Sequence, residues 1–201
     1  MNLDFISDER IKKQILFALE MDKLKQILRK TSILGKSRKE NSAEHSWHLA
    51  LIAILLAEYA NESIDLLKTL KMILVHDIAE IEAGDTLVYH RSSSTSKKED
   101  QAAQKIFSNL PSDQAKEFYM LWKEFEEGDS IEARFARAMD RMAPVLLNYA
   151  NQGDTWREYS ISHQQALKIN DRIVEGSSQI WEIVKKLFSS AIEKGFLGKG
   201  N

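Results

Sequence analysis

The sequence predicts an all-α protein folded as a single domain, and three features of its 201 residues lead to this prediction. Apolar residues recur at intervals of three and four along most of the chain, which is the period of an amphipathic helix. Prolines and glycines, which interrupt helices, number only two and eight. No stretch alternates apolar and polar residues as a half-buried strand does, and no linker divides the chain. We therefore expect one helical bundle over residues 1–201, with its core at about 10–190.

The helices expected near the N-terminus follow from apolar spacing and capping residues. The first is expected over 8–30, and its buried side would carry Ile11, Ile15, Leu19, Leu24, Ile27 and Leu28. After a basic loop, a second helix begins at Asn41 or Ser42, because both are favourable N-cap residues and Glu44 completes a capping box. It ends near Asn61.

The remaining elements are expected from the same period. A third helix runs from about 65 to Gly84, which suits the left-handed position at a helix C-terminus. Residues 89–96 are rich in serine and are expected to form a loop. Further helices are expected at about 98–109, 112–127, 130–149 and 171–194.

The composition excludes several classes of protein. The chain has no cysteine, which excludes disulfides, thiolate nucleophiles and sulfur-rich metal sites. Its net charge is −2 with acids and bases interspersed, which argues against a nucleic-acid polymer as partner but leaves room for a small anionic ligand. No apolar run reaches the roughly 18 residues of a membrane helix, and the first twenty residues do not resemble a signal peptide. We expect a cytoplasmic protein without membrane contacts.

Four polar residues stand out because they lie in apolar, helical stretches: His45, the adjacent pair His76 and Asp77, and Asp140. Two imidazoles and two carboxylates converging from three helices would form a mixed nitrogen and oxygen site for a divalent metal. Taken singly, His45 could be a hydrogen-bonded core histidine, and Asp140 could pair with a neighbouring arginine. Glu80, one turn beyond His76, would face the same site, where unpaired buried carboxylates would be costly without a cation.

The segments 38–46, 76–85 and 138–141 together resemble the HD-domain metal-dependent phosphohydrolase superfamily, and most closely its bacterial 5′-deoxynucleotidase branch. The resemblance covers about residues 10 to 190 and implies an all-α HD domain with one divalent metal bound by His45, His76, Asp77 and Asp140. Manganese, cobalt, iron, zinc and magnesium all suit such a ligand set. A two-metal site would need more histidines between Asp77 and Asp140 than His90 alone, which favours one metal.

The resemblance also implies roles for two further acids. Glu80 matches the position of an acid beside the attacking water, and Asp85 matches one that orients the water or the leaving oxygen. The chemistry agrees, because a metal makes bound water more acidic and a nearby carboxylate can accept the proton. The alternatives are a helix-surface acid for Glu80 and a turn-forming aspartate for Asp85.

The predicted substrate contacts rest on fewer signals. Arg38 matches a basic family position and Lys30 is a competing base, so either could bind a phosphate. Trp156 could stack on a nucleobase or could simply be packed in the core. The nucleotidase branch carries an Arg-Trp element that helps select the sugar, whereas residues 29–33 read Arg-Lys-Thr-Ser-Ile without tryptophan. This departure bears on the deoxynucleotide preference and not on hydrolase chemistry.

The function that this sequence predicts is removal of phosphate from a nucleoside or deoxynucleoside 5′-monophosphate. A first alternative is an HD hydrolase of a nucleotide triphosphate or an alarmone, although alarmone enzymes carry an adjacent Glu-Asp pair where Glu80 is followed by Ile81. A second is a non-catalytic, metal-stabilised ligand-binding protein, against which Glu80 and Asp85 argue, since a structural metal needs no additional carboxylates. Apolar faces near 146–147 and 180–188 would build the core, and some could form a homodimer interface.

Overall fold

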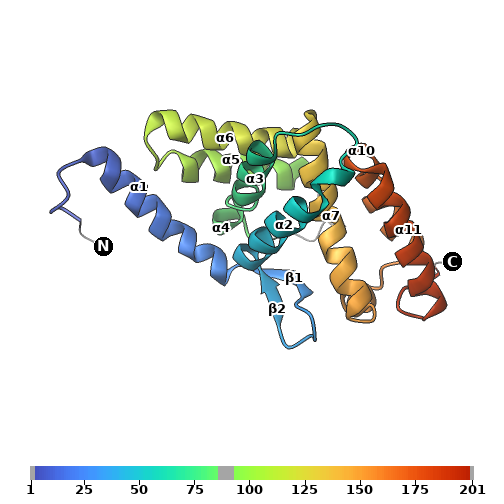
Figure 1. Cartoon of the computed structure of the whole chain (residues 1–201). Helices are drawn as coiled ribbons and strands as arrows, with labels where there is room; N and C mark the ends of the chain where they lie inside the picture. The colour runs from blue at the N-terminus through green and yellow to red at the C-terminus, as the bar shows by residue number, and fades with distance from the viewer. Residues whose placement is uncertain (1–2, 86–92, 200–201) are drawn as a thin grey trace.

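The computed structural model describes residues 3–85 and 93–199, and helices dominate it, which confirms the all-α prediction (Figure 1). The helices are α1 (Glu9–Glu20), α2 (Ser42–Leu56), α3 (Leu66–Val75), α4 (Glu80–Ala83), α5 (Ser93–Phe107), α6 (Ser112–Glu127), α7 (Ile131–Ala150), α8 (Asp154–Glu158), α9 (His163–Asn170), α10 (Ile173–Gly176) and α11 (Ser178–Glu193). Two 3₁₀ helices, η1 (Met21–Gln26) and η2 (Ala57–Tyr59), and two strands, β1 (Leu28–Ser32) and β2 (Lys39–Asn41), complete the described elements.

Helix α7 is the central element of the bundle. It contacts α2, α3 and α6 as well as α10 and α11, and Figure 1 shows it running between these groups. The side chain of Ser130 caps its first turn, and Phe135 and Met139 are fully buried on its inner face. Buried residues from Phe17 to Leu197 join in one hydrophobic cluster. Nearly the whole chain therefore contributes to the core that holds α7 in place.

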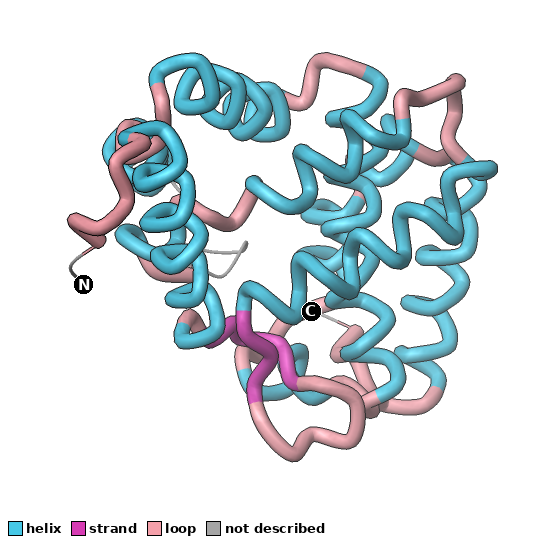
Figure 2. Tube along the Cα trace, turned by 60° about the vertical axis from the view of Figure 1, so that its left-hand side comes forward, coloured by secondary structure: helices cyan, strands magenta, loops and turns pink. Residues whose placement is uncertain are grey.

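The predicted helix at 8–30 is wrong beyond Glu20. The chain continues as the 3₁₀ helix η1 and then as β1, which pairs antiparallel with β2 (Figure 2). The turn between the strands contains Gly35 and Lys36, both with positive φ. Whether a short segment forms a strand depends on its pairing partner and on packing, so helical periodicity in a single segment does not reveal it. The sequence analysis expected no strands, and this expectation is wrong for residues 28–32 and 39–41.

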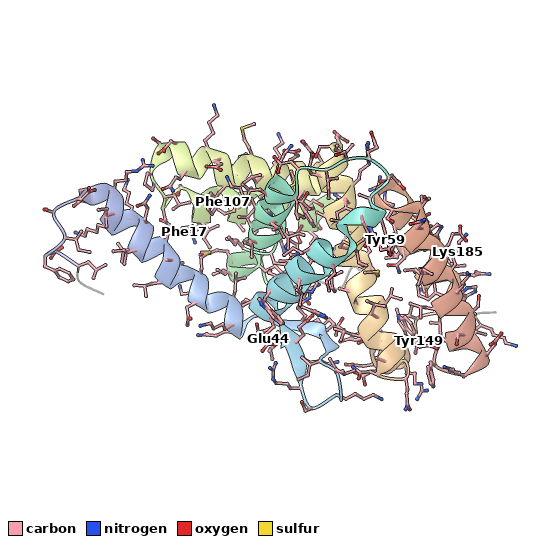
Figure 3. The ribbon with its side chains drawn as sticks, viewed as in Figure 1. Phe17, Glu44, Tyr59, Phe107, Tyr149 and Lys185 are labelled. Carbon is pink, nitrogen blue, oxygen red and sulfur yellow. The ribbon has the colours of Figure 1, made fainter. Side chains whose placement is uncertain are left out.

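The apolar side of α1 is also less buried than predicted. Ile11 and Leu19 are 48% and 47% exposed, and Leu28 in β1 is 58% exposed. The helix instead buries Phe17, whose ring packs edge-on against Phe118 and lies 6.4 Å from that of Phe107 (Figure 3). Leu24 is buried as predicted.

The predicted third helix is interrupted where the His-Asp pair lies. Helix α3 ends at Val75, and the turn residues that follow form i to i+3 backbone bonds until α4 begins at Glu80. The His76 Nδ1 donates to the carbonyl of Ile73 at 2.7 Å, and this carbonyl would otherwise accept the next helical N–H. Gly84 has a positive φ of 77°, but its ψ of 156° is extended, so it is not in the left-handed helical conformation that was predicted.

The capping box of Asn41 and Glu44 is confirmed, and α6 and α7 agree with the helices predicted at 112–127 and 130–149. Residues 93–96 lie in α5, so the predicted loop is wrong there, while residues 89–92 with His90 fall outside the described residues. The predicted helix at 171–194 is divided at Ser177, whose side chain caps α11. Helices α8 and α9 were not predicted. Within the described ranges, no helix combines the length and apolarity needed to cross a membrane.

Candidate active site

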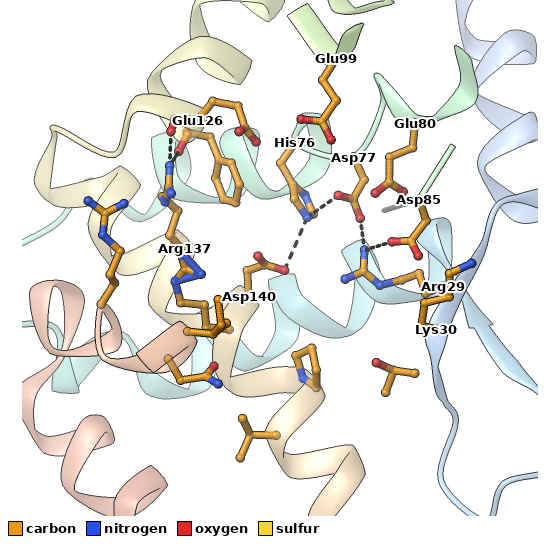
Figure 4. A pocket seen from close by; sticks show the side chains of 18 of the residues that line it. Arg29, Lys30, His76, Asp77, Glu80, Asp85, Glu99, Glu126, Arg137 and Asp140 are labelled. Atoms are coloured by element: carbon orange, nitrogen blue, oxygen red, sulfur yellow. Dashed lines mark hydrogen bonds and ion pairs between the residues drawn. The ribbon is translucent and has the colours of Figure 1, made fainter. Parts of the chain in front are cut away.

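The predicted metal ligands come together from separate parts of the fold. Helix α2 carries His45, the turn after α3 carries His76 and Asp77, and the middle of α7 carries Asp140. The ligand atoms of His45, His76 and Asp140 all lie within 4.8 Å of one another. His45 Nε2 is 2.9 Å from the Asp140 carboxylate. His76 Nε2 is 3.0 Å from the Asp77 carboxylate (Figure 4). His45, His76 and Asp140 can therefore hold a metal together, and Asp77 as a fourth ligand stays a prediction.

The outer nitrogens of both imidazoles lie beside protein oxygens. The Nδ1 of His76 donates to the Ile73 carbonyl, which leaves Nε2 directed at the carboxylates. His45 Nδ1 lies 3.3 Å from the carboxylate of Glu40, a residue of β2 that is only 3% exposed. A carboxylate or carbonyl on the far nitrogen is the usual arrangement for a metal-binding histidine. The imidazole and carboxylate donors, with oxygens beside the outer imidazole nitrogens, fit a divalent metal. Glu40 was not predicted, because one acid ahead of a helix carries no distinctive signal.

The charges of this cluster stabilise each other. Burial would raise the pKa of Asp77, but His76 and Arg29 hold it well below its usual range. Burial likewise opposes the low pKa of Asp140, which the hydrogen bond with His45 maintains. Burial would lower the pKa of His76, whereas the carboxylates of Asp77 and Asp140 raise it to about 9. The carboxylates are thus held ionised, as metal ligands must be.

Glu80 and Asp85 line the same cavity beside these ligands. The Ser42 hydroxyl donates to the Glu80 carboxylate at 2.6 Å, which fixes this side chain at the start of α4. Burial, reinforced by the charge of Asp77, raises the pKa of Glu80 to about 8. Burial also raises the pKa of Asp85. Both acids therefore line the cavity beside the candidate metal ligands, and their catalytic roles stay predictions.

Arg29 is the main feature of the site that the sequence did not single out. Strand β1 places its guanidinium inside the cluster, where Nη1 donates to Asp77 at 2.7 Å and lies 4.0 Å from Asp85. Burial opposes its charge, but the surrounding carboxylates raise the pKa of Arg29 above its ordinary value. The sequence offered one signal for Arg29. It is the arginine of the Arg-Lys pair that replaces the Arg-Trp element of the nucleotidase branch.

A cavity of about 610 Å³ opens over these side chains. Lys30 and Trp156 are among the residues that line it, and the Trp156 ring is buried 5.8 Å from that of Phe188. Arg38 is not among them, since its exposed guanidinium bonds the Glu44 carboxylate at 2.6 and 2.8 Å. The predicted phosphate contact of Arg38 finds no support in this placement. The phosphate contact of Lys30 and the nucleobase stacking of Trp156 stay predictions.

Comparison with known proteins gives one family and several relatives. The HD domain family matches residues 21–181. The 5′-deoxynucleotidase HDDC2 of Homo sapiens is 30% identical over 111 residues, which are 54% of this chain and 53% of the relative. The 5′-deoxynucleotidase hdd1 of Schizosaccharomyces pombe is 25% identical over 168 residues, covering 76% of this chain and 83% of the relative. The chain spans about half the length of the mammalian relatives that it matches.

Solved structures show the same architecture. A predicted metal-dependent phosphohydrolase from Magnetospirillum magnetotacticum MS-1 is 41% identical with a TM-score of 0.90, covering 94% of this chain and 98% of the other. An HD-domain phosphohydrolase from Listeria innocua is 17% identical with a TM-score of 0.60, covering 90% and 86%. At that identity the likeness shows the fold alone.

Proposed function

This chain belongs to the HD domain family, and from this membership and the cavity we propose that it is a metal-dependent phosphohydrolase acting on nucleoside or deoxynucleoside 5′-monophosphates. The observation that carries the proposal is the cluster of His45, His76 and Asp140, within 4.8 Å, beside a cavity that also presents Glu80 and Arg29. The names of the human and yeast relatives support the substrate class.

His45, His76, Asp77 and Asp140 would hold one divalent ion. When bound, such an ion polarises a phosphoryl oxygen and makes water a better nucleophile at neutral pH. The hard carboxylates and borderline imidazoles accept manganese, cobalt, iron, zinc or magnesium, and supply and geometry decide among them.

The remaining side chains would position the reactants and move the proton. Glu80, held by Ser42, would accept a proton from the attacking water, for which a pKa near the working pH is favourable. Asp85 would orient the water or the leaving oxygen. The Arg29 guanidinium would bind a phosphate oxygen, since its planar donors match phosphate geometry.

The test is phosphate release from nucleoside and deoxynucleoside mono- and triphosphates, with each of manganese, cobalt, zinc and magnesium. We expect release from 5′-monophosphates, and a loss of at least about 100-fold in kcat for Glu80→Gln. Glu82→Gln is the matched control, because this acid lies on the same short helix and pairs with Lys105 at 2.7 Å. Release from triphosphates alone would move the substrate class, and metal and nucleotide binding without any release would favour a binding protein.

We also propose that the chain forms a single HD domain and a homodimer. The shared core from Phe17 to Leu197 supports the first. The second is supported by an exposed apolar stripe on α2, where Trp47 is 67% and Leu55 is 63% exposed. Light scattering of the wild type and of Trp47→Glu would test it, with a dimer that becomes a monomer as the expected result. A cytoplasmic location stays a prediction.

A further inference from the structure

Asn170, the last residue of α9, lines the cavity with an amide that is bonded at one end only. The residue is buried, with 5% of its surface exposed. Its Nδ2 donates to the backbone carbonyl of Ala166, one turn earlier, at 2.8 Å, and this bond fixes which end of the amide is the donor. Within residues 3–85 and 93–199 no group donates to its Oδ1, and protein atoms do not enclose this oxygen. Asn170 therefore presents a hydrogen-bond acceptor to the cavity.

A second asparagine of the same cavity shows which bond Asn170 lacks. Asn148 is anchored in the same way, since its Nδ2 donates to the carbonyl of Pro144, one turn earlier, at 2.9 Å. Its Oδ1, however, accepts the backbone N–H groups of Thr155 and Trp156 at 2.9 and 3.2 Å. Buried polar groups of folded proteins have hydrogen-bond partners as a rule. The open oxygen of Asn170 thus suits a donor that a ligand supplies.

A nucleoside 5′-monophosphate offers two kinds of donor to this oxygen. Its phosphate only accepts hydrogen bonds when ionised, which leaves the sugar hydroxyls and the amino or imino groups of the base. The sugar is attached directly to the 5′ phosphate, for which Arg29 is the proposed partner. Two residues after Arg29, Thr31 is 7% exposed and lines the cavity, and its hydroxyl has no partner among the described side chains and backbone. The sugar therefore has a polar partner on β1, and Asn170 lies on a different element.

The walls of the cavity suit a planar base. Helix α7 contributes Pro144 and Val145, about one turn beyond Asp140, and Ile169 lies directly before Asn170. The volume of about 610 Å³ is in the range of small-molecule pockets, which are mostly apolar and orient their ligand with a few polar groups. A base that packs on these apolar side chains would have its polar edge free for Asn170.

We propose that Asn170 accepts a hydrogen bond from an exocyclic amino group of the nucleobase, so that cytosine and adenine nucleotides are preferred over uracil and hypoxanthine nucleotides. This role rests on the proposed function and concerns specificity, not the hydrolysis itself. An amino group donates to the Oδ1, whereas a keto oxygen at the same place would face another acceptor and leave both unpaired. The amide of Asn170 cannot turn over to offer its donor end without losing the bond to Ala166.

The experiment compares two pairs of substrates in which a keto oxygen replaces the amino group. They are deoxycytidine against deoxyuridine 5′-monophosphate, and deoxyadenosine against deoxyinosine 5′-monophosphate. In the manganese-loaded enzyme we expect kcat/KM to favour the amino member of each pair by about 10-fold, the order of one hydrogen bond whose partner is left unpaired.

Two variants separate this role from a structural one, because both lose the bond to the Ala166 carbonyl. Asn170→Leu also loses the acceptor and should make kcat/KM equal within each pair. Asn170→Asp keeps an acceptor and should retain the preference. Asn61→Leu is the matched control, since Asn61 donates to the carbonyls of Val174 and Glu175 in α10 at 2.7 and 3.2 Å but does not line this cavity. Its ratios should equal those of wild type.

Equal kcat/KM within both pairs in the wild type would overturn the role of Asn170. A preference that Asn170→Leu leaves intact, or that Asn170→Asp abolishes, would overturn it too. If no nucleotide is hydrolysed, the proposed function is wrong, and calorimetric binding of the four nucleotides to the manganese-loaded protein decides the role of Asn170 by itself. Tighter binding of the amino member of each pair would then support it, and equal binding or none would overturn it.

Discussion

Replacing Glu40 by glutamine tests whether this buried acid supports His45 as the proposed metal ligand. The Glu40 carboxylate lies 3.3 Å from His45 Nδ1 and 3.7 Å from Arg29 Nε, and its side chain is 4% exposed. Glutamine has nearly the same shape, so the substitution removes the negative charge without opening a cavity. The imidazole then faces a neutral amide in place of a carboxylate, and it loses the negative charge that raises its basicity.

The size of the effect follows from the place of Glu40 behind the ligand. Loss of an outer-shell partner typically weakens metal binding by about 10- to 100-fold, or roughly 1.4–2.7 kcal/mol. Removing a ligand itself should cost more, because it deletes a bond to the ion. We therefore expect Glu40→Gln to weaken manganese binding by about 10- to 100-fold, and His45→Ala to weaken it further.

Calorimetric titration of the metal-free protein with manganese measures this affinity directly and does not depend on turnover. Glu158→Gln is the matched control, because it removes a carboxylate that pairs with Lys39 of the same strand at 2.6 Å but does not contact a ligand. Manganese affinity of Glu40→Gln within twofold of wild type, in a protein with an unchanged Tm, would refute the supporting role of Glu40.

Three further predictions concern stability. In the metal-free protein the Glu80 pKa is raised to about 8, so the stability this group contributes is full below its unfolded pKa, about 4.3, and is lost as the pH rises through 8. Urea unfolding with chelator should therefore show that the free energy of unfolding of Glu80→Gln, relative to that of wild type, is higher at pH 9 than at pH 5. The same difference between the two proteins at both pH values would contradict this. Arg29→Met removes the cation beside Asp77 and should cost about 3–5 kcal/mol without metal, so manganese should raise its Tm more than that of wild type; equal shifts would count against it. Met139→Ala should cost about 2–5 kcal/mol in urea, because Met139 is 0% exposed beside Asp140, whereas Met120→Ala, at 57% exposure, should cost little; equal costs would contradict the burial argument.

The sequence by itself determined the helical class and the position of several helices, and it indicated four candidate ligand residues. Helical period and capping are local properties, so Asn41 and Glu44 mark the start of α2 without reference to the rest of the fold. His45 and Asp140 were predicted as ligands from local sequence too, because both lie in apolar helical stretches. Polar groups in apolar helical stretches must be compensated when buried, and their chemical types already limit what can compensate them.

Only the tertiary structure decided which bases and acids join the ligands. Arg29 and Arg38 lie nine residues apart in one basic segment, yet β1 carries Arg29 into the cluster while Arg38 pairs with Glu44 outside the cavity. Strand β2 brings Glu40 to His45 by the same pairing, which depends on hydrogen bonds between two strands and not on the period of either segment. The tertiary structure also decides which residues of an apolar helix face are buried. Helical period shows that α1 has such a face, but packing leaves Ile11 exposed and buries Phe17, because burial depends on which other elements lie against the helix.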